Sequence, residues 1–250
     1  MEYLEHHIVD HCNLNCAGCS HFSPLADHWF EDFETFKRDF TQLYNITQGD
    51  VHVIRLMGGE PLLHPHFEDM VAFTCVMFNK SQVQLVTNGI LIPKEFEKLK
   101  SLSDTYPNFS ICISNYGLKL AEDLIAVLPR VRRDNKAELY NISLDLFGEI
   151  NPKTAFQYCD LHIHHWYYFQ NGCFYPCCIC ANIDYFNGYF YLDLPDEENC
   201  ISIYNHTLDE IEHFLNQPIP LCSFCNTVQR QRSYHPFGVS KKEINEWICQ

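Results

Sequence analysis

The sequence lacks a long apolar segment and is poor in basic residues. No run approaches the roughly 18 apolar residues that a membrane span requires, and the start, MEYLEHHIVD, lacks the basic and apolar regions of a signal peptide. Lys and Arg number 17 against 32 Asp and Glu, which gives a formal net charge of -15. This charge repels phosphate backbones and anionic lipid surfaces. We therefore expect a cytoplasmic protein that binds neither nucleic acid nor membranes.

Internal repeats, low-complexity tracts and long linkers are also missing. The 250 residues are 46% hydrophobic and 20% charged, enough to bury one substantial core with a small appendage, so disorder is excluded as the main state. Cysteine, by contrast, is abundant, with 14 residues. Without a secretory signal, this abundance favours metal sites over disulfides.

The first part of the chain, from Tyr3 to about Asn151, alternates short strand-like runs with amphipathic segments. This alternation is typical of βα units around a parallel sheet. Strands are expected at 4–9, 51–57, 82–87, 109–114 and 138–144, and helices at about 31–45, 66–79, 94–102 and 119–128. Five such units indicate an α/β fold, either a partial barrel or an open doubly wound sheet.

After Asn151-Pro152, the composition of the chain becomes aromatic and rich in cysteine. Asn171-Gly172 and Asn187-Gly188 are turn signals between aromatic runs and predict hairpins. A last helix is expected from Ser240 to Ile248, where Ser240 and Glu243 have the spacing of a capping box. We therefore expect two domains, at residues 1–151 and 152–250.

The first group of cysteines directly follows the first expected strand. Cys12, Cys16 and Cys19 have the spacing C-x3-C-x2-C in one loop. Three thiolates on a short loop can bind three irons of a 4Fe-4S cube and leave the fourth iron open for chemistry. A zinc site completed by His11 or His21, or three buried core cysteines, would also fit this spacing.

The second expected strand ends in a glycine-rich turn, Met57-Gly58-Gly59-Glu60-Pro61. Two glycines let the backbone approach a ligand closely at the carboxyl edge of the sheet. Alone, such a turn is a weak signal. Its position one βα unit after the C-x3-C-x2-C loop makes the pair specific.

Over residues 3 to about 150, this pair of motifs resembles the radical S-adenosylmethionine (SAM) superfamily. The resemblance implies a partial (βα)5-6 TIM-like barrel in which Cys12, Cys16 and Cys19 ligate a 4Fe-4S cluster. SAM would chelate the open iron, and the turn formed by Gly58, Gly59, Glu60 and Pro61 would line its methionyl amine. One position departs from the family, because Gly18 stands where an aromatic residue usually precedes the third cysteine.

Polar residues at the ends of the third and fourth strands are further family positions. By resemblance they would meet the SAM carboxylate and ribose, and the matching places are Thr87-Asn88-Gly89 and Ser114-Asn115. We therefore include Asn88, Ser114 and Asn115 among the cofactor-binding candidates. Ordinary turn chemistry also favours these residue types at strand ends.

A second group of cysteines lies in the C-terminal part. It comprises Cys159, Cys177, Cys222 and Cys225, which can close a four-thiolate site for structural zinc or for a fully ligated 4Fe-4S cluster. The pattern C-x9-15-G-x4-C followed by C-x2-C resembles the SPASM/twitch extension of radical SAM enzymes, in its shorter twitch version. That resemblance implies one auxiliary 4Fe-4S cluster, with Cys178 as an alternative to Cys177.

The remaining cysteines and the histidine groups carry weaker signals. Cys75 and Cys112 fall in apolar patterns typical of the core, whereas Cys200 and Cys249 show no pattern. The groups His6-His7, His64-Pro65-His66 and His162-Ile163-His164-His165 could supply a second metal site or an acid or base. Polar candidates for the barrel mouth, none with an assigned role, are Arg55, Tyr116, Asp145, His164 and Arg230.

The resemblance implies an enzyme that cleaves SAM reductively to a 5′-deoxyadenosyl radical and abstracts hydrogen from its substrate. Small twitch enzymes such as 2-deoxy-scyllo-inosamine dehydrogenases oxidise an alcohol, with the auxiliary cluster accepting the second electron. We expect a small carbohydrate- or cyclitol-like substrate and an electron donor such as flavodoxin or ferredoxin. The alternatives are a peptide maturase, disfavoured by the short stretch before Cys12, a sugar epimerase, and a non-catalytic iron-sulfur electron carrier or zinc scaffold.

Overall fold

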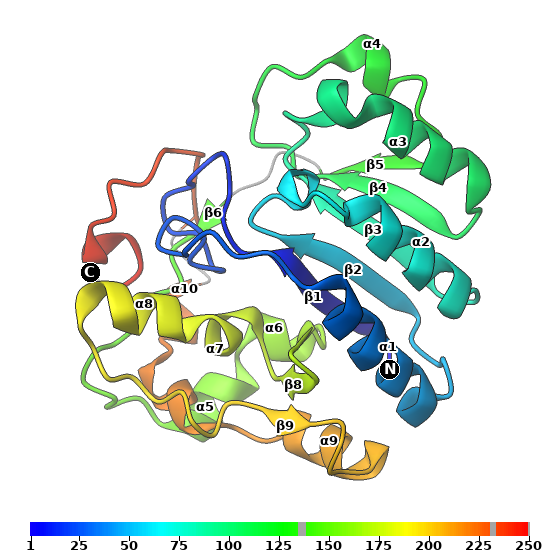
Figure 1. Ribbon diagram of the computed structural model, residues 1–250. Helices are drawn as coiled ribbons and strands as arrows, with labels where there is room; N and C mark the ends of the chain where they lie inside the picture. Colours follow the sequence, from blue (N-terminus) through cyan, green and yellow to red (C-terminus); the bar gives the residue numbers. More distant parts are fainter. Residues whose placement is uncertain (135–138, 231–233, 250) are drawn as a thin grey trace. The chain divides into compact units, whose positions relative to one another are not determined.

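The computed structural model describes residues 1–134, 139–230 and 234–249, which form two compact units (Figure 1). The first, here called the sheet unit, comprises Met1–Asn13 and His28–Ala137. The second, the cysteine-rich unit, comprises Leu14–Asp27 and Glu138–Gln250. Among the described residues, no helix combines the length and the apolarity that a bilayer crossing needs.

The sheet unit contains a parallel sheet with its strands in sequence order. Neighbouring strands pair in parallel throughout, as expected for successive βα units. The strands are β1 (Tyr3–Val9), β2 (Val53–Gly58), β3 (Gln82–Thr87), β4 (Phe109–Ile113) and β5 (Val131–Arg133). The intervening helices are α1 (Phe33–Thr47), the 3-10 turn η1 (Pro61–Leu63), α2 (Phe67–Met77), α3 (Ile92–Thr105) and α4 (Glu122–Ile125). Figure 1 shows α1, α2 and α3 side by side along this sheet.

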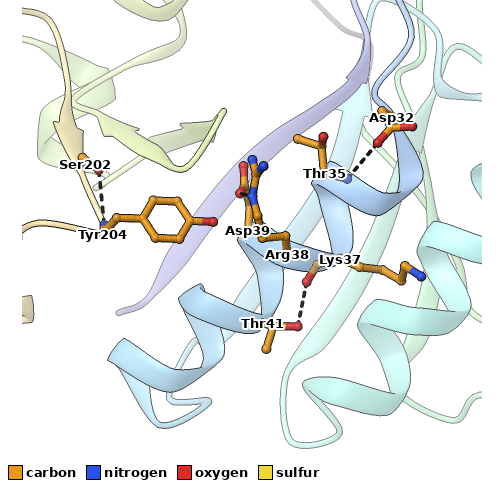
Figure 2. Close-up of polar contacts among 8 residues, drawn as sticks. All are labelled: Asp32, Thr35, Lys37, Arg38, Asp39, Thr41, Ser202 and Tyr204. Atoms are coloured by element: carbon orange, nitrogen blue, oxygen red, sulfur yellow. Dashed lines mark hydrogen bonds and ion pairs between the residues drawn. The ribbon is translucent and has the colours of Figure 1, made fainter.

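Helix α1 shows how the local sequence sets these elements. Asp32 caps its N-terminus, because the side chain accepts a hydrogen bond from the Thr35 backbone N–H at 2.9 Å (Figure 2). Its apolar face buries Phe36 and Phe40, whose rings stack 4.1 Å apart, and the Phe40 ring also meets His6 of β1. The helix ends at Gln48, which adopts the left-handed conformation. The core of the sheet unit is therefore built from the inner face of this helix and the buried strand β1.

The cysteine-rich unit contains short elements around its own core. Its antiparallel strands are β7 (Tyr167–Gln170), β8 (Cys173–Tyr175) and β9 (Ile201–Ser202), and a separate pair joins β6 (Leu139–Tyr140) to β10 (Tyr234–His235). Its helices are α5 (Pro152–Gln157), α6 (Asp160–Ile163), α7 (Cys178–Ala181), α8 (Ile183–Phe190), α9 (Leu208–Leu215) and α10 (Thr227–Arg230), with 3-10 turns η2 (Pro220–Phe224) and η3 (Ile244–Glu246). Beyond β9, the Tyr204 N–H donates to the Ser202 hydroxyl at 3.2 Å (Figure 2).

The compact units do not follow the single boundary expected at residue 151. The segment 14–27 belongs to the cysteine-rich unit because Phe22 and Leu25 are buried in its core. The ring centroids of Phe22 and Phe186 lie 5.3 Å apart, and those of Phe22 and Trp247 lie 6.2 Å apart. Two apolar side chains close to the C-x3-C-x2-C loop therefore pack this early segment into the core of the later unit. The alternation of strands and helices in the sequence does not indicate this packing.

The fifth expected strand, 138–144, was misassigned. Residue 138 lies outside the described residues, and Leu139–Tyr140 pairs antiparallel with Tyr234–His235 in the cysteine-rich unit. The strand that follows β4 in the parallel sheet is β5, formed by the basic sequence Val131-Arg132-Arg133. Edge strands are short and often charged, so β5 lacks the apolar pattern that identifies inner strands.

Of the two expected hairpin turns, the structure confirms one. Asn171-Gly172 forms the turn between β7 and β8, with both residues at positive φ. Asn187-Gly188 instead lies inside α8, where the Asn187 side chain bonds both backbone groups of Leu194. Only η3 is helical within 240–248, because backbone hydrogen bonds of Leu144 with Trp247 and Cys249 pair Ile248 with Leu144 instead.

Phe40→Ala tests the core of the sheet unit. Removing this fully buried ring should lower the free energy of unfolding by about 3–5 kcal/mol through lost burial and a residual cavity. The thermal midpoint should fall by roughly 2–4 °C for each kcal/mol. Phe147→Ala, at a side chain that is 84% exposed, is the matched control and should leave the midpoint unchanged. Equal midpoints for the two variants would contradict the assigned core.

Candidate active site and thiol cavity

The glycine turn after β2 packs directly on the end of β1. The Gly59 N–H donates to the Val9 carbonyl at 2.8 Å, and the Glu60 N–H donates to the His11 carbonyl at 3.2 Å. A Cβ at Gly58, whose φ is +148°, would lie 1.9 Å from the Val9 oxygen, and one at Gly59 would lie 2.1 Å from the His11 oxygen. Only glycine allows this approach, which sets the turn beside the residue that precedes Cys12.

Glu60 is fully buried and links the glycine turn to the end of β3. Its Oε1 accepts hydrogen bonds from the Thr87 hydroxyl at 2.6 Å and from the Leu62 N–H at 3.1 Å. Its Oε2 accepts the Asn88 N–H at 2.8 Å. Burial raises the pKa of Glu60 to about 7, although these hydrogen bonds oppose the rise. Both carboxylate oxygens are thus used within the protein, which suits a residue that positions the motif.

Asn88 connects this network to the first thiol. Its side-chain Nδ2 lies 2.7 Å from the Asn13 Oδ1 and 3.9 Å from the Cys12 Sγ, while its Oδ1 accepts the Ile90 N–H at 3.0 Å. Within the sheet unit, the structure therefore brings together the glycine turn, Glu60, Asn88 and Cys12. These residues are part of the set that the SAM-binding prediction expects at one edge of the sheet.

Ser114 and Asn115 lie at the same carboxyl edge. The Ser114 N–H donates to the Thr87 carbonyl at 2.9 Å, so Ser114 continues the β3–β4 pairing. The Asn115 side chain accepts the Gly117 N–H at 3.1 Å in a local turn. Contact of either residue with SAM stays a prediction.

Cys16 and Cys19 lie in the cysteine-rich unit, whereas Cys12 lies in the sheet unit. Cys16 forms an antiparallel bridge with Val239, flanked by hydrogen bonds from the Ala17 N–H to Gly238 and from the Ser240 N–H to Asn15. The carbonyl of Cys19 accepts the Trp247 Nε1–H at 3.0 Å. Joint ligation of one cluster by the three thiols therefore stays a prediction from their spacing.

The electrostatics around Cys19 favour its thiolate. Burial opposes ionisation, but hydrogen bonds and charge from His21 outweigh it, so the pKa of Cys19 lies below its usual value. The thiolate is the form that binds iron.

The unusual Gly18 also has a structural reason. It adopts the left-handed conformation, with φ +67°, and a Cβ there would approach the Glu246 carbonyl at 3.1 Å and the His235 Nε2 at 3.3 Å. The C-terminal segment therefore occupies the space that an aromatic side chain would need.

The second group of cysteines converges within the cysteine-rich unit. Cys159 precedes α6, Cys177 precedes α7, and Cys222 and Cys225 lie in η2 and directly after it. All four line one cavity, together with His162 and Arg230. Three chain segments, separated in sequence, thus bring the expected thiols to one place.

The spacing of these sulfurs favours a group wider than a single ion. Zinc binds thiolates at about 2.3 Å in a tetrahedron, which brings each pair of sulfurs to about 3.8 Å. Among the residues that the structure describes, no three of these four sulfurs lie within 4.8 Å of one another. A 4Fe-4S cluster takes one thiolate on each of its irons, so this donor set and its spacing fit a cluster better than zinc.

Cys177 rather than Cys178 faces this cavity. Cys178 is buried in the hydrophobic core of the unit and does not line the cavity. The pKa of Cys177 falls to about 7, mainly through a hydrogen bond with Cys180, whereas burial raises the pKa of Cys225 to about 12. The structure thus favours the ligand that the motif spacing selected.

The weaker candidates have mostly structural positions. Cys75 and Cys112 are buried, as expected for core residues. In the described part of the chain, no group of three or more metal-binding side chains combines the histidines of the clusters noted above. Of the barrel-mouth candidates, Arg55 bonds Gln84 on the neighbouring strand, Asp145 caps the backbone of Phe147 and Glu149, and His164 stacks on Trp166.

Arg230 has a position that its sequence context did not specify. It lies in the thiol cavity of the cysteine-rich unit, where Nη1 is 3.5 Å from the Cys159 Sγ. The side chain is buried, with 3% of the residue exposed. Its five-residue distance from Cys225 was the available signal, because a cation close to a thiolate pair in sequence is a candidate partner.

Comparison with known proteins agrees with this arrangement. The model of the radical SAM superfamily matches residues 7–140, more than half of the chain. The chain belongs to the radical SAM superfamily. Membership implies an enzyme that uses a 4Fe-4S cluster and SAM.

Two curated relatives are GTP 3',8-cyclases. The one from Heliobacterium modesticaldum is 34% identical over 119 residues, which cover 44% of this chain and 34% of that protein. The one from Limosilactobacillus fermentum is 31% identical over 112 residues, which cover 44% of this chain and 33% of that protein. The chain thus spans about a third of the length of these relatives.

A solved structure matches nearly the whole chain. The crystal structure of BtrN in complex with AdoMet and 2-DOIA covers 90% of this chain and 92% of its own, with a TM-score of 0.54 and 16% sequence identity. At this identity the likeness concerns the fold, and it establishes the radical SAM fold for this chain.

Gly59→Ala should disrupt the SAM-binding edge. The added Cβ would collide with the His11 carbonyl, so the turn must move away from β1 and Cys12. We expect SAM affinity, measured by equilibrium dialysis with the reconstituted protein, to fall at least tenfold, or about 1.4 kcal/mol. Gly188→Ala adds a methyl group in open space within α8 and should leave SAM affinity unchanged. Unchanged affinity in Gly59→Ala would contradict the assigned site.

Glu60→Gln should change the pH dependence of stability. Because burial raises the pKa of Glu60 in the folded protein, its carboxyl group contributes full stability below the ordinary pKa of 4.5 and loses it as the pH rises through about 7. The glutamine amide cannot accept hydrogen bonds at both former carboxylate oxygens, which lowers the free energy of unfolding by about 1–3 kcal/mol. The variant should therefore have the lower thermal midpoint at pH 5, and the difference should narrow by pH 8. A constant difference between pH 5 and 8 would contradict this titration.

Proposed function

We propose that this protein is a radical SAM oxidoreductase of the twitch type, which dehydrogenates a small carbohydrate- or cyclitol-like alcohol. The observation that carries the proposal is the cavity lined by Cys159, Cys177, Cys222 and Cys225. Four thiolates leave no open iron for substrate, so the site suits the uptake of an electron. An oxidation by two electrons needs such an acceptor after the first hydrogen atom has left.

The residues of the loop and the sheet edge would hold the reactive cofactors. Cys12, Cys16 and Cys19 would bind three irons of the first cluster, and the backbone of Gly58 and Gly59 would face the methionyl group of SAM. A bound cluster with SAM supplies a radical able to abstract hydrogen from an unactivated carbon. Glu60 would keep the turn and Asn88 in place, through the buried hydrogen bonds already described.

A polar cavity adjoins the cluster loop within the cysteine-rich unit. It has a volume of about 520 Å³ and is lined by Ala17 and Gly18, with polar groups from Asn141, His235 and Glu246 among its walls. This size and polarity suit a small polyol. The His235 Nδ1 lies 2.9 Å from the Pro236 carbonyl, which favours the tautomer with its proton on Nδ1 and leaves Nε2 as an acceptor.

Cyclisation of GTP is a second candidate, favoured by the names of the two curated relatives. Two observations weigh against it. The net charge of -15 disfavours a polyphosphate substrate, and the likeness to those relatives covers only 44% of this chain. An electron donor such as flavodoxin or ferredoxin would serve either reaction.

Anaerobic reconstitution with iron and sulfide tests the proposal. We expect about eight irons per chain, formation of 5′-deoxyadenosine from SAM under a strong reductant, and an oxidised product from a panel of cyclitol and sugar alcohols. The same assay with GTP should give no cyclised product. Conversion of GTP would favour the second candidate, and an absence of SAM cleavage at any iron content would overturn both.

Replacing cysteines separates the two sites. Cys222→Ala with Cys225→Ala should reduce iron by about four per chain and abolish the oxidised product, whereas Cys12, Cys16 and Cys19 changed together to Ala should abolish SAM cleavage. The control changes Cys75 and Cys112, two buried core cysteines, to Ala and should keep about eight irons. Full iron content in the Cys222/Cys225 variant would defeat the auxiliary site.

A further inference from the structure

Arg230 lies against the sulfurs of the thiol cavity. It is the last residue of α10, and its Nη1 is 3.5 Å from the Cys159 Sγ. The same cavity is lined by Cys177, Cys222 and Cys225. One buried cation therefore shares this cavity with all four expected ligands.

The chain fixes this cation in place. The Arg230 Nε donates to the Ile142 carbonyl at 3.2 Å, and its backbone N–H donates to the Asn226 carbonyl at 3.0 Å. The Asn226 N–H in turn donates to the Ser143 carbonyl at 3.0 Å, and Leu144 bridges to Cys225. Helix α10 also contacts α5, which precedes Cys159. The guanidinium is thus held by the same segments that hold the thiols.

The charge opposes the cost of burying thiolates. Away from bulk water, a cation near sulfur interacts more strongly than on a solvated surface.

We propose that Arg230 is a positioning residue that raises the reduction potential of the auxiliary 4Fe-4S cluster and so makes this site an electron acceptor. This inference rests on the proposed function, because it requires a cluster in the thiol cavity. Reduction adds one negative charge, and a fixed cation at the ligand sulfurs stabilises the reduced form more than the oxidised one. Net charge and hydrogen bonds to sulfur are the established determinants of cluster potentials.

The alternative hypothesis is that Arg230 only stabilises the fold, through its hydrogen bond to the Ile142 carbonyl. Loss of the side chain would then lower stability without changing the potential. A measurement of the potential itself distinguishes the two roles, because it reports on the balance of oxidised and reduced forms in whatever protein has folded and bound iron.

The experiment uses the full chain in which Cys12, Cys16 and Cys19 are Ala, so that the auxiliary cluster alone contributes to the spectrum. Its midpoint potential is measured by an electron paramagnetic resonance titration after reconstitution. Arg230→Gln and Arg230→Met should each lower the ratio of reduced to oxidised cluster at a given potential by at least tenfold, a shift of about 59 mV for one electron. Arg230→Lys, which keeps the charge, should recover most of this shift.

Lys153→Gln provides the matched control. Lys153 lies in α5 of the same unit, and its side chain is exposed, so the solvent screens its charge. Its loss should leave the potential unchanged.

The outcomes separate the inference from the proposed function. A potential equal to that of the parent in either neutral variant overturns the role of Arg230. Loss of iron from both neutral variants, with iron retained in Arg230→Lys, also overturns it in favour of a role in cluster assembly. If the parent protein itself binds zinc or no metal in the thiol cavity, the proposed function fails, irrespective of Arg230.

Discussion

The sheet unit depends on one buried carboxylate, that of Glu60. A carboxyl group without water is costly unless donors surround it, and here three donors from two separate segments do so. These bonds hold the glycine turn after β2 against the end of β3. Asn88 then extends the same network to Cys12. The position of the first thiol therefore follows from a polar contact rather than from apolar packing alone.

In the cysteine-rich unit, the groups that are costly to bury are thiolates, and a buried cation offsets this cost. Its four thiols gather in a largely buried cavity, where burial disfavours thiolates and raises the pKa values of Cys222 and Cys225. Arg230, held through Ile142, supplies a compensating cation. Both sites thus place a costly buried charge where several chain segments meet, and the hydrogen bonds that offset the cost also fix the geometry.

The sequence predicted the elements whose patterns are local. Strands β1 to β4 lie within two residues of their expected bounds, because their apolar runs are bounded by polar turns. The cysteine motifs were likewise local in spacing and specific to a family. The edge strand β5 was not predicted because Arg132 and Arg133 interrupt its apolar pattern. The helix expected over 240–248 was wrong because tertiary pairing with Leu144 overrode a local capping signal.

The position of the segment 14–27 could not be predicted, since it depends on contacts between distant residues. Phe22 packs with Phe186 and Trp247, which come more than 160 residues later, and the Trp247 indole binds the carbonyl of Cys19. The last part of the chain therefore fixes the backbone of a loop near its start. Two of the three expected ligands of the first cluster, Cys16 and Cys19, are bound in this way by residues 238–247. A change far from the cysteine motif, at Trp247 or Val239, would thus act on that loop, although no local sequence pattern connects them.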